Sequence, residues 1–219
     1  MNRLAIFDCD GTLVDSQANI CLAMEDSFTR GGLIPPDRAA IRRIVGLSLN
    51  EAILALAPDA APELHVQISE DYKTAFQRLR GAGLVEEPLF EGIAEIIDVL
   101  DNTGWMLGVA TGKSDRGLAH CLAYHDLTDR FVTLQTADRH PSKPHPSMVY
   151  QAITDAGAAP DTTVMIGDTT FDIAMARAAN VSAIGVSWGY HAPDELLAEG
   201  AHHIADTADD ILKFAGSFA

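Results

Sequence analysis

A short apolar run near the amino terminus ends in two aspartates one residue apart, and this feature constrains the fold most. Leu4–Phe7 has the composition of a buried strand, and Asp8, Asp10 and Gly11 follow it. Two carboxylates so close repel each other, and burial raises the cost of ionising either one. A hard cation such as Mg²⁺ removes this difficulty, and Gly11 lets the chain turn sharply. The stretch predicts a metal-assisted acid site at the carboxyl end of a strand. The alternative is a strand followed by an ordinary Asp-Gly turn.

The region from residue 15 to residue 83 has the pattern of helices alone. Apolar residues recur at helical spacing within Gln17–Arg30 and within Pro62–Arg80, and glycines follow each run. Shorter helices are expected at Asp37–Val45 and Glu51–Ala57, the second capped by the preceding turn. We therefore expect an all-helical insert after the first strand, above the carboxyl edge of the sheet.

Strands and helices alternate from Gly92 onward, which predicts a parallel sheet covered by helices on both faces. The predicted fold is α/β, a Rossmann-like parallel sheet built from residues 1–14 and 84–219, with residues 15–83 as the insert. The expected later strands are Trp105–Ala110, Phe131–Gln135, Thr163–Ile166 and Ala183–Val186, with a short sixth near Ile204. The expected helices are Ile93–Asn102, Asp115–His125, Ser147–Ala156, Ile173–Ala179, Pro193–Glu199 and Ala208–Phe214.

The balance of charge argues against some partners. With 31 acidic and 15 basic residues the formal net charge is -16, so the chain repels polyanions and no nucleic acid is expected to bind. A small phosphate ligand remains compatible, because a metal and a few cations set the local field. Cys9, Cys21 and Cys121 lack paired or metal-type spacing, and no signal peptide or membrane-spanning run is apparent. A cytoplasmic protein without a membrane partner is expected, as a monomer or a homodimer.

Candidate site residues follow the expected strands. Thr111-Gly112-Lys113 follows the second strand, Gly167-Asp168 follows the fourth with Asp172 one helical turn later, and Lys143 lies in a proline-rich loop between them. Each piece has an ordinary alternative, as a helix cap, a solvated charge or the acidic first turn of a helix. Their order on this alternating pattern indicates one site.

These pieces together resemble the haloacid dehalogenase-like (HAD) superfamily of phosphatases with a small helical cap, and most closely its phosphoglycolate phosphatases. The matching residues are Asp8-Cys9-Asp10-Gly11-Thr12-Leu13-Val14-Asp15, Thr111, Lys143, Gly167-Asp168 and Asp172. They span nearly the whole catalytic domain. The resemblance implies a HAD-like catalytic core, a cap at residues 15–83, and hydrolysis of small phosphate monoesters of the phosphoglycolate or sugar-phosphate type.

The resemblance also implies a role for each residue. Asp8 is the nucleophile that forms an aspartyl-phosphate, and Asp10 protonates the leaving oxygen and then takes a proton from the hydrolytic water. Mg²⁺ is held by the side chains of Asp8 and Asp168 and the main-chain carbonyl of Asp10, and Asp172 supports it directly or through water. Thr111 and Lys143 hold the transferring oxygens.

Further substrate contacts are expected from the main-chain amides of Cys9 and Gly112, from Lys113, and from the cap residue Arg43. An arginine there, Arg42 or Arg43, can grip a second anionic group of the substrate, although both also read as ordinary solvated helix charges. Gly112 stands where relatives commonly carry Asn, so one side-chain contact to substrate is expected to be missing. The Cys9 thiol is expected to be a small packed group, since nearby carboxylates raise its pKa.

Two other activities of the superfamily fit the sequence poorly. Dehalogenases lack the second aspartate that Asp10 supplies, and phosphonate-cleaving relatives need a cap lysine, whereas none occurs between Asp10 and Lys73. A phosphatase remains the expectation, with a β-phosphoglucomutase-type mutase as the alternative. A catalytically inactive HAD-fold binding protein is less favoured, because the nucleophile, the acid and the metal ligands are all present. The Trp188-Gly189-Tyr190 loop is expected to serve packing, and His140, His145 and His191 receive no role.

Overall fold

One parallel sheet carries the fold. The computed structural model describes residues 1–216, and within them the sheet has the strand order β3-β2-β1-β4-β5-β6, with every neighbouring pair parallel. The predicted α/β parallel-sheet fold is therefore confirmed. The strands are β1 (Asn2–Phe7), β2 (Trp105–Thr111), β3 (Thr133–Thr136), β4 (Ala158–Gly167), β5 (Ser182–Val186) and β6 (His203–Ala205).

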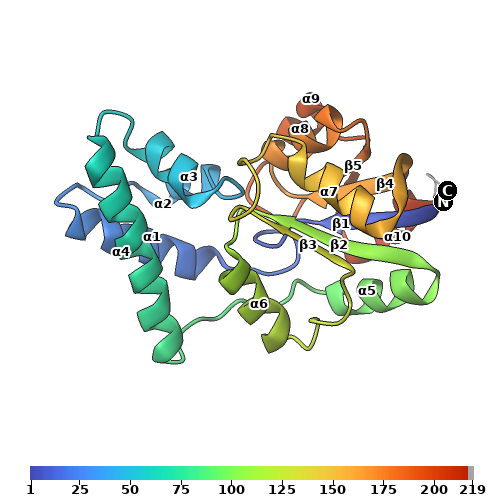
Figure 1. Cartoon of the computed structure of the whole chain (residues 1–219), viewed down its shortest axis with the longest axis horizontal. Coiled ribbons are helices and arrows are strands. Elements are labelled where there is room, and N and C mark those ends of the chain that lie inside the picture. The colour runs from blue at the N-terminus through green and yellow to red at the C-terminus, as the bar shows by residue number, and fades with distance from the viewer. Residues whose placement is uncertain (217–219) are drawn as a thin grey trace.

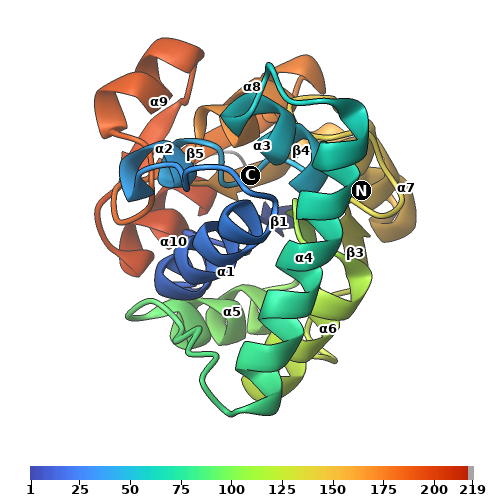
Figure 2. The ribbon, with the colours of Figure 1, turned by 90° about the vertical axis from the view of Figure 1, so that its left-hand side faces the viewer.

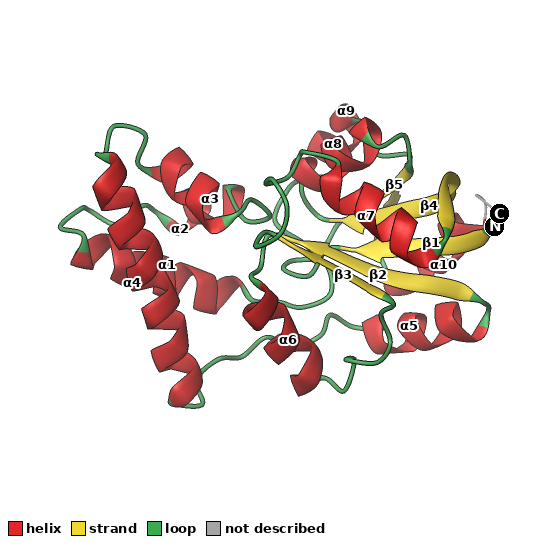
Figure 3. Ribbon diagram, in the orientation of Figure 1, coloured by secondary structure: helices red, strands yellow, loops and turns green. Residues whose placement is uncertain are grey.

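Helices cover both faces of the sheet, as alternation along the strands requires. In β1, Ala5 and Phe7 join the apolar cluster on one face, whereas Leu4 and Ile6 join the cluster on the other. The first face packs against α5 (Ile93–Asn102), α6 (Asp115–Tyr124) and α10 (Ala208–Gly216). The second face packs against α7 (Ser147–Ala156), α8 (Thr170–Ala178) and α9 (Pro193–Glu199), and Figures 1 and 3 show this three-layer arrangement.

The insert forms a separate helical layer, which we call the cap. It contains α1 (Gln17–Arg30), α2 (Arg38–Arg43), α3 (Leu49–Leu56) and α4 (Pro62–Gly81). These helices share their own buried cluster, in which Phe28, Ile41, Ile53 and Ile68 are 0–2% exposed. Figure 2, seen from the cap side, shows the four helices in front of the carboxyl ends of the strands.

Two chain segments connect the cap to the sheet, and they run side by side. The amide of Phe90 donates to the carbonyl of Leu13 at 3.0 Å, and the amide of Asp15 donates to the carbonyl of Pro88 at 2.9 Å. A short antiparallel bridge joins Val14 to Leu89 within the same contact. The cap therefore enters and leaves the fold at one place, directly beside the end of β1.

The structure shifts some expected element ends. β4 begins at Ala158, earlier than the expected Thr163, and its register with β1 changes near Asn2. Helix α3 begins at Leu49, and Ser48 occupies its N-cap position without a side-chain capping bond. The Ser48 amide instead donates to Ser142 Oγ at 2.8 Å, and this hydrogen bond ties the cap to the sheet domain. None of the helices within residues 1–216 is long and apolar enough to span a lipid bilayer.

The cap cluster gives a test of this architecture. Ile53 is 0% exposed within the cluster, whereas its neighbour Leu54 is 46% exposed. We expect Ile53→Ala to lower the free energy of unfolding by about 2–5 kcal/mol, because it leaves a cavity. We expect Leu54→Ala to change it by no more than about 0.5 kcal/mol. Urea denaturation followed by circular dichroism measures both, and equal effects would contradict a cap with its own packed core.

Candidate active site

Three buried carboxylates meet at the carboxyl edge of the sheet. Asp8, Asp168 and Asp172 each offer an oxygen within 4.8 Å of the others. One cation lies among them, because Lys143 Nζ is 2.8 Å from Asp8 Oδ1 and 2.6 Å from Asp172 Oδ1. The side chains of these four residues are at most 2% exposed. The structure thus brings together the predicted nucleophile, the lysine and two of the predicted metal ligands.

The local fold explains why these groups converge. β1 pairs with β4 in parallel, with Phe7 opposite Ile166, so Asp8 and Asp168 leave the sheet next to each other. Gly11 has a φ of 88°, and a Cβ on it would lie 2.2 Å from Asp168 Oδ2. A Cβ on Gly189 would lie 2.1 Å from Asp168 Cβ. Only glycine fits at either position, which supports the expected sharp turn after the strand.

Hydrogen bonds hold two of the carboxylates in place. Asp168 accepts from Thr12 Oγ1 and from the amide of Tyr190, each at 2.9 Å. Asp172 Oδ2 accepts from the amide and the hydroxyl of Thr169, at 3.0 and 2.7 Å, and so closes the capping box of α8. Neither oxygen of Asp8 accepts a well-directed hydrogen bond from the described residues. Asp8 is therefore the carboxylate that the protein leaves unsatisfied.

Burial dominates the electrostatics of this cluster. It raises the pKa of Asp8 to about 7, against the opposing effect of Lys143. Burial, followed by the charges of Asp172 and Asp8, holds the pKa of Asp168 well above its usual value. Burial alone would lower the pKa of Lys143, but the Asp172 and Asp8 carboxylates outweigh it and keep the lysine charged.

The donor set fits a divalent cation. Three buried carboxylates share Lys143 within the described residues, and burial disfavours their charged forms, so a further cation is needed for all three to be ionised together. Clustered carboxylate oxygens are the ligands that Mg²⁺ prefers. Both oxygens of Asp168 and both oxygens of Asp172 accept protein hydrogen bonds, whereas Asp8 has only its ion pair with Lys143 and so suits direct ligation best. Ligation by the main-chain carbonyl of Asp10 stays a prediction.

Asp10 lies beside this cluster in a separate network. Its Oδ1 accepts a short hydrogen bond from Ser16 Oγ and lies 2.8 Å from Lys113 Nζ. Lys113 Nζ is also 2.7 Å from Oε1 of Glu87, a carboxylate that is 6% exposed and lies in the segment returning from the cap. Lys113 thus pairs with Asp10 and Glu87 while it also lines the cavity, and its expected contact with substrate stays a prediction. No sequence pattern marks Glu87 or Ser16 as part of this network.

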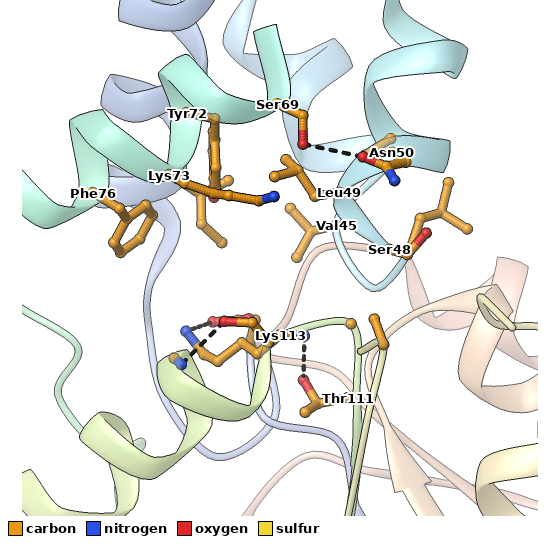
Figure 4. Close-up of a pocket in the computed structure, with 18 of the residues that line it drawn as sticks. Val45, Ser48, Leu49, Asn50, Ser69, Tyr72, Lys73, Phe76, Thr111 and Lys113 are labelled. Carbon is orange, nitrogen blue, oxygen red and sulfur yellow. Dashed lines mark hydrogen bonds and ion pairs between the residues drawn. The ribbon is translucent and has the colours of Figure 1, made fainter. Parts of the chain in front are cut away.

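A cavity of about 380 Å³ separates the sheet edge from the cap. Asp8, Asp10 and Thr111 line its floor, and Figure 4 shows Thr111 and Lys113 below α4. Thr111 Oγ1 accepts from the amide of Lys113 at 3.2 Å, which leaves its hydroxyl proton free to donate to a bound oxygen. The predicted phosphoryl-binding residue therefore faces the cavity beside the predicted nucleophile and acid.

Gly112 and Cys9 flank the floor in different ways. A Cβ on Gly112 would lie 2.4 Å from the Leu47 carbonyl oxygen, so the cap backbone occupies the space of a side chain there. Cys9 Sγ lies 3.8 Å from Cys121 Sγ inside the apolar cluster below the sheet. Contact with Cys121 and burial raise the pKa of Cys9, and its thiol packs as expected. Donation by the main-chain amides of Cys9 and Gly112 stays a prediction.

Arg43 pairs with an acidic residue of the sheet domain, and its expected contact with substrate stays a prediction. Arg43 Nη1 forms an ion pair with Glu195 at 2.7 Å, and Arg43 is not among the residues that line the cavity. Its carbonyl accepts from His191 Nε2 at 3.2 Å, while His191 Nδ1 accepts the Thr170 amide at 3.1 Å. Arg43 and the buried His191 thus hold the cap to the sheet domain, a role that sequence reasoning did not assign to this histidine.

Comparisons with known proteins agree with this geometry. A family model described as haloacid dehalogenase-like hydrolase matches residues 5–186. The chain is 37% identical to the probable phosphatase IndB of Dickeya dadantii, over 98% of this chain and 94% of that protein. It is 31% identical to a phosphoglycolate phosphatase of Agrobacterium fabrum, over 87% of this chain and 82% of that protein. A solved hydrolase from Pseudomonas syringae matches with a TM-score of 0.87 at 25% identity and covers 100% of both chains.

The pKa of Asp8 gives a test of the metal site. In the metal-free protein burial raises the pKa of Asp8 to about 7, whereas the unfolded carboxyl has its ordinary pKa of about 4, so stability falls as the pH rises through this range. Mg²⁺ must displace that proton, so its affinity rises with pH by up to about tenfold per unit for each proton released. We expect Mg²⁺ to raise the melting temperature more at about pH 8 than at about pH 6. Thermal denaturation with Mg²⁺ or with chelator measures this, and Asp8→Asn should show a smaller rise with a weaker pH dependence. A rise that is equal at both pH values would contradict ligation by Asp8.

The buried lysine gives a second test. Lys143 is 0% exposed between two carboxylates, whereas Lys213 is 70% exposed in an ion pair with Asp210. Without metal at neutral pH, we expect Lys143→Met to lower the free energy of unfolding by about 3–5 kcal/mol, because it leaves the carboxylates unpaired. Added Mg²⁺ should recover part of this loss. Lys213→Met is the matched control and should have little effect in urea denaturation. Similar effects of the two substitutions would contradict the balance of charge described here.

Proposed function

The chain belongs to the haloacid dehalogenase-like hydrolase family, and from this membership we propose that it is a Mg²⁺-dependent phosphatase of small phosphate monoesters. The observation that carries the proposal is Asp8, a buried carboxylate with unsatisfied oxygens at the floor of a cavity, beside Lys143 and close to Asp10. The two relatives named above are both phosphatases, which supports the same reaction class.

Asp8 acts as the nucleophile in the first step. One carboxylate oxygen forms a bond to phosphorus while the bond from phosphorus to the ester oxygen breaks, which yields an aspartyl-phosphate. Asp10 gives its proton to the departing alcohol oxygen. Water then attacks the phosphorus of the intermediate, Asp10 takes a proton from that water, and inorganic phosphate leaves Asp8 free again.

Two side chains hold the oxygens of the transferring group. Lys143 supplies a fixed positive charge beside Asp8, and the Thr111 hydroxyl has a free proton to donate. When Mg²⁺ is bound, it offsets the negative charges of the carboxylates and the phosphate as they approach each other. Asp8 and Asp168 would hold it with their side chains, with help from the Asp10 carbonyl and from Asp172.

The acid–base role of Asp10 depends on its own neighbours. Ser16 and Lys113 both contact Oδ1, so they fix the carboxyl group and leave Oδ2 to exchange the proton. Because the cap covers the cavity, bulk water is excluded and small substrates suit the site.

The location and the partners complete the proposal. The partner is a small phosphorylated metabolite, and phosphoglycolate and sugar phosphates are the first candidates, since one relative is named a phosphoglycolate phosphatase. We also propose a cytoplasmic location, because Cys9 and Cys121 lie side by side as free thiols.

Phosphate release from a panel of esters tests the proposal. The panel contains phosphoglycolate, sugar phosphates, nucleotides, pyridoxal phosphate and an aryl phosphate, each with Mg²⁺ or with chelator. We expect Mg²⁺-dependent release that Asp8→Asn lowers by on the order of 10³-fold or more, because the nucleophile is lost. Asp10→Asn should lower it by roughly 10²–10⁴-fold, because proton transfer is lost in both steps.

Other results would select a different function. If no ester releases phosphate while acetyl phosphate still phosphorylates Asp8, the chain is a mutase that passes the group to a sugar. If the folded protein binds Mg²⁺ but shows neither release nor phosphorylation, it is a binding protein on this fold. Exposed Asp209→Asn is a matched aspartate control and should leave release unchanged.

A further inference from the structure

The cap side of the cavity is apolar. Met24 from α1, Val45 from the turn before α3, Leu49 from α3, and Tyr72 and Phe76 from α4 line it, and we call these five residues the apolar wall. Figure 4 shows Val45, Leu49, Tyr72 and Phe76 above the floor that holds Thr111 and Lys113. A substrate whose phosphoryl group reaches Asp8 would place its alcohol part against this wall.

Two members of the wall are aromatic and only half-buried. Tyr72 and Phe76 lie one helical turn apart, with ring centroids 5.4 Å apart and planes tilted by 46°. Met24 and Val45 behind them are 1% and 7% exposed, so the wall is backed by packed side chains. The apolar surface of Tyr72 and Phe76 that borders the cavity is not covered by other protein atoms. A nonpolar ring of a substrate would cover it, and removing this surface from water is favourable.

Besides Lys113 on the floor, the cations Lys73, Arg80 and Arg116 line the cavity. Lys73 is 52% exposed and pairs with Glu70 at 2.7 Å, and the Arg80 guanidinium lies 5.9 Å from the centroid of the Phe76 ring. Arg116 is exposed on α6. These cations can attract a phosphate dianion toward the cavity of an acidic chain. None of the described cap residues that line the cavity carries a carboxylate. The main polar contact among the cap residues inside the cavity is the neutral hydrogen bond of 3.0 Å from Ser69 to Asn50.

We propose that the substrate's alcohol part is a neutral, ring-bearing group that packs against the apolar wall while the phosphoryl group lies on Asp8. A second anionic group packed against this wall would lose its hydration, and the two cap cations that line the cavity already have partners, Lys73 in Glu70 and Arg80 in the Phe76 ring. A polyhydroxylated chain against the wall would leave hydroxyl groups unsatisfied. The cavity, at about 380 Å³, lies in the range of roughly 300–1,000 Å³ typical of small-molecule sites. The inference rests on the proposed phosphatase function and narrows its substrate class.

Matched esters test this inference. Benzyl phosphate and ethyl phosphate are both esters of primary alcohols and differ by the ring, and cyclohexylmethyl phosphate separates aromaticity from bulk. We expect kcat/KM with Mg²⁺ to be at least about tenfold higher for benzyl phosphate than for ethyl phosphate or phosphoglycolate, the gain that a filled apolar subsite supplies. An equal or higher kcat/KM for phosphoglycolate would overturn the inference. It would indicate that Lys73 binds a second anionic group of the substrate.

Variants of the wall localise the effect. Phe76→Ser should reduce the benzyl-to-ethyl ratio of kcat/KM by about tenfold, and Phe76→Leu should restore most of it, because leucine keeps the apolar surface. Val66→Ser is the control, since Val66 is on the same helix, is 65% exposed and does not line the cavity. Circular dichroism confirms that each variant is folded. An unchanged ratio in folded Phe76→Ser would overturn the inference.

The test separates the two proposals. If ethyl phosphate or phosphoglycolate is hydrolysed at least as fast as benzyl phosphate, and Asp8→Asn abolishes this, the phosphatase proposal stands and the ring-binding inference fails. If no ester is hydrolysed, the phosphatase proposal fails. Calorimetry with benzylphosphonate and ethylphosphonate then decides the inference alone, since neither is hydrolysed: it survives only if benzylphosphonate binds at least about tenfold tighter in the Mg²⁺-loaded protein.

Discussion

The cluster of three buried carboxylates around one lysine is the constraint on which the rest of the structure depends. Asp8, Asp168 and Asp172 lie within 4.8 Å of one another through their oxygens, and Lys143 pairs with Asp8 and Asp172. Such a cluster is costly to bury and needs every neighbour in position. The close approach of Gly11 and the capping box that holds Asp172 are both consequences of placing it. In the proposed function, a divalent cation and a phosphoryl group complete this site.

The cap is the second determinant of what the site can do. Its two connecting segments pair beside Asp15, and Lys113 bridges Asp10 to Glu87 on the returning segment. The proposed catalytic acid is therefore linked through Lys113 to the segment that returns from the cap. Gly112 admits the cap backbone against the floor, whereas a side chain there would collide with the Leu47 carbonyl. In the proposed function, the cap lies close to the floor of the cavity, where it excludes bulk water and places the apolar wall beside the alcohol part of the ester.

The sequence predicted the floor of the site well, for a physical reason. Asp8, Thr111 and Asp168 follow strands, and parallel strands end at one edge, so strand order alone brings them together. Lys143 and Asp172 were candidates from their order along the chain, but their roles came from the family resemblance, since loop and helix positions carry no such rule. The helical character of residues 15–83 also followed from apolar periodicity.

Other features depend on contacts between distant segments and escaped prediction. Arg43 was predicted to contact substrate, and its ion pair with Glu195, 152 positions away in the sequence, was not predicted. Glu87 and Ser16 carry no motif, and their place beside Asp10 comes from the pairing of the two connecting segments. The apolar wall was visible in the sequence only as the core-facing stripe of a helix. Which part of that stripe borders a cavity is decided by how the cap docks.

Rapid chemical quench of the wild-type enzyme during turnover of a labelled phosphate ester tests the central claim most directly. The account predicts a transient covalent phosphate, at most one per chain, that is released by hydroxylamine as an acyl-phosphate is and that maps to the peptide containing Asp8. Its decay should match the release of inorganic phosphate. Phosphate release at full rate with no covalent phosphate at any time, or with the label on another residue, would contradict nucleophilic catalysis by Asp8.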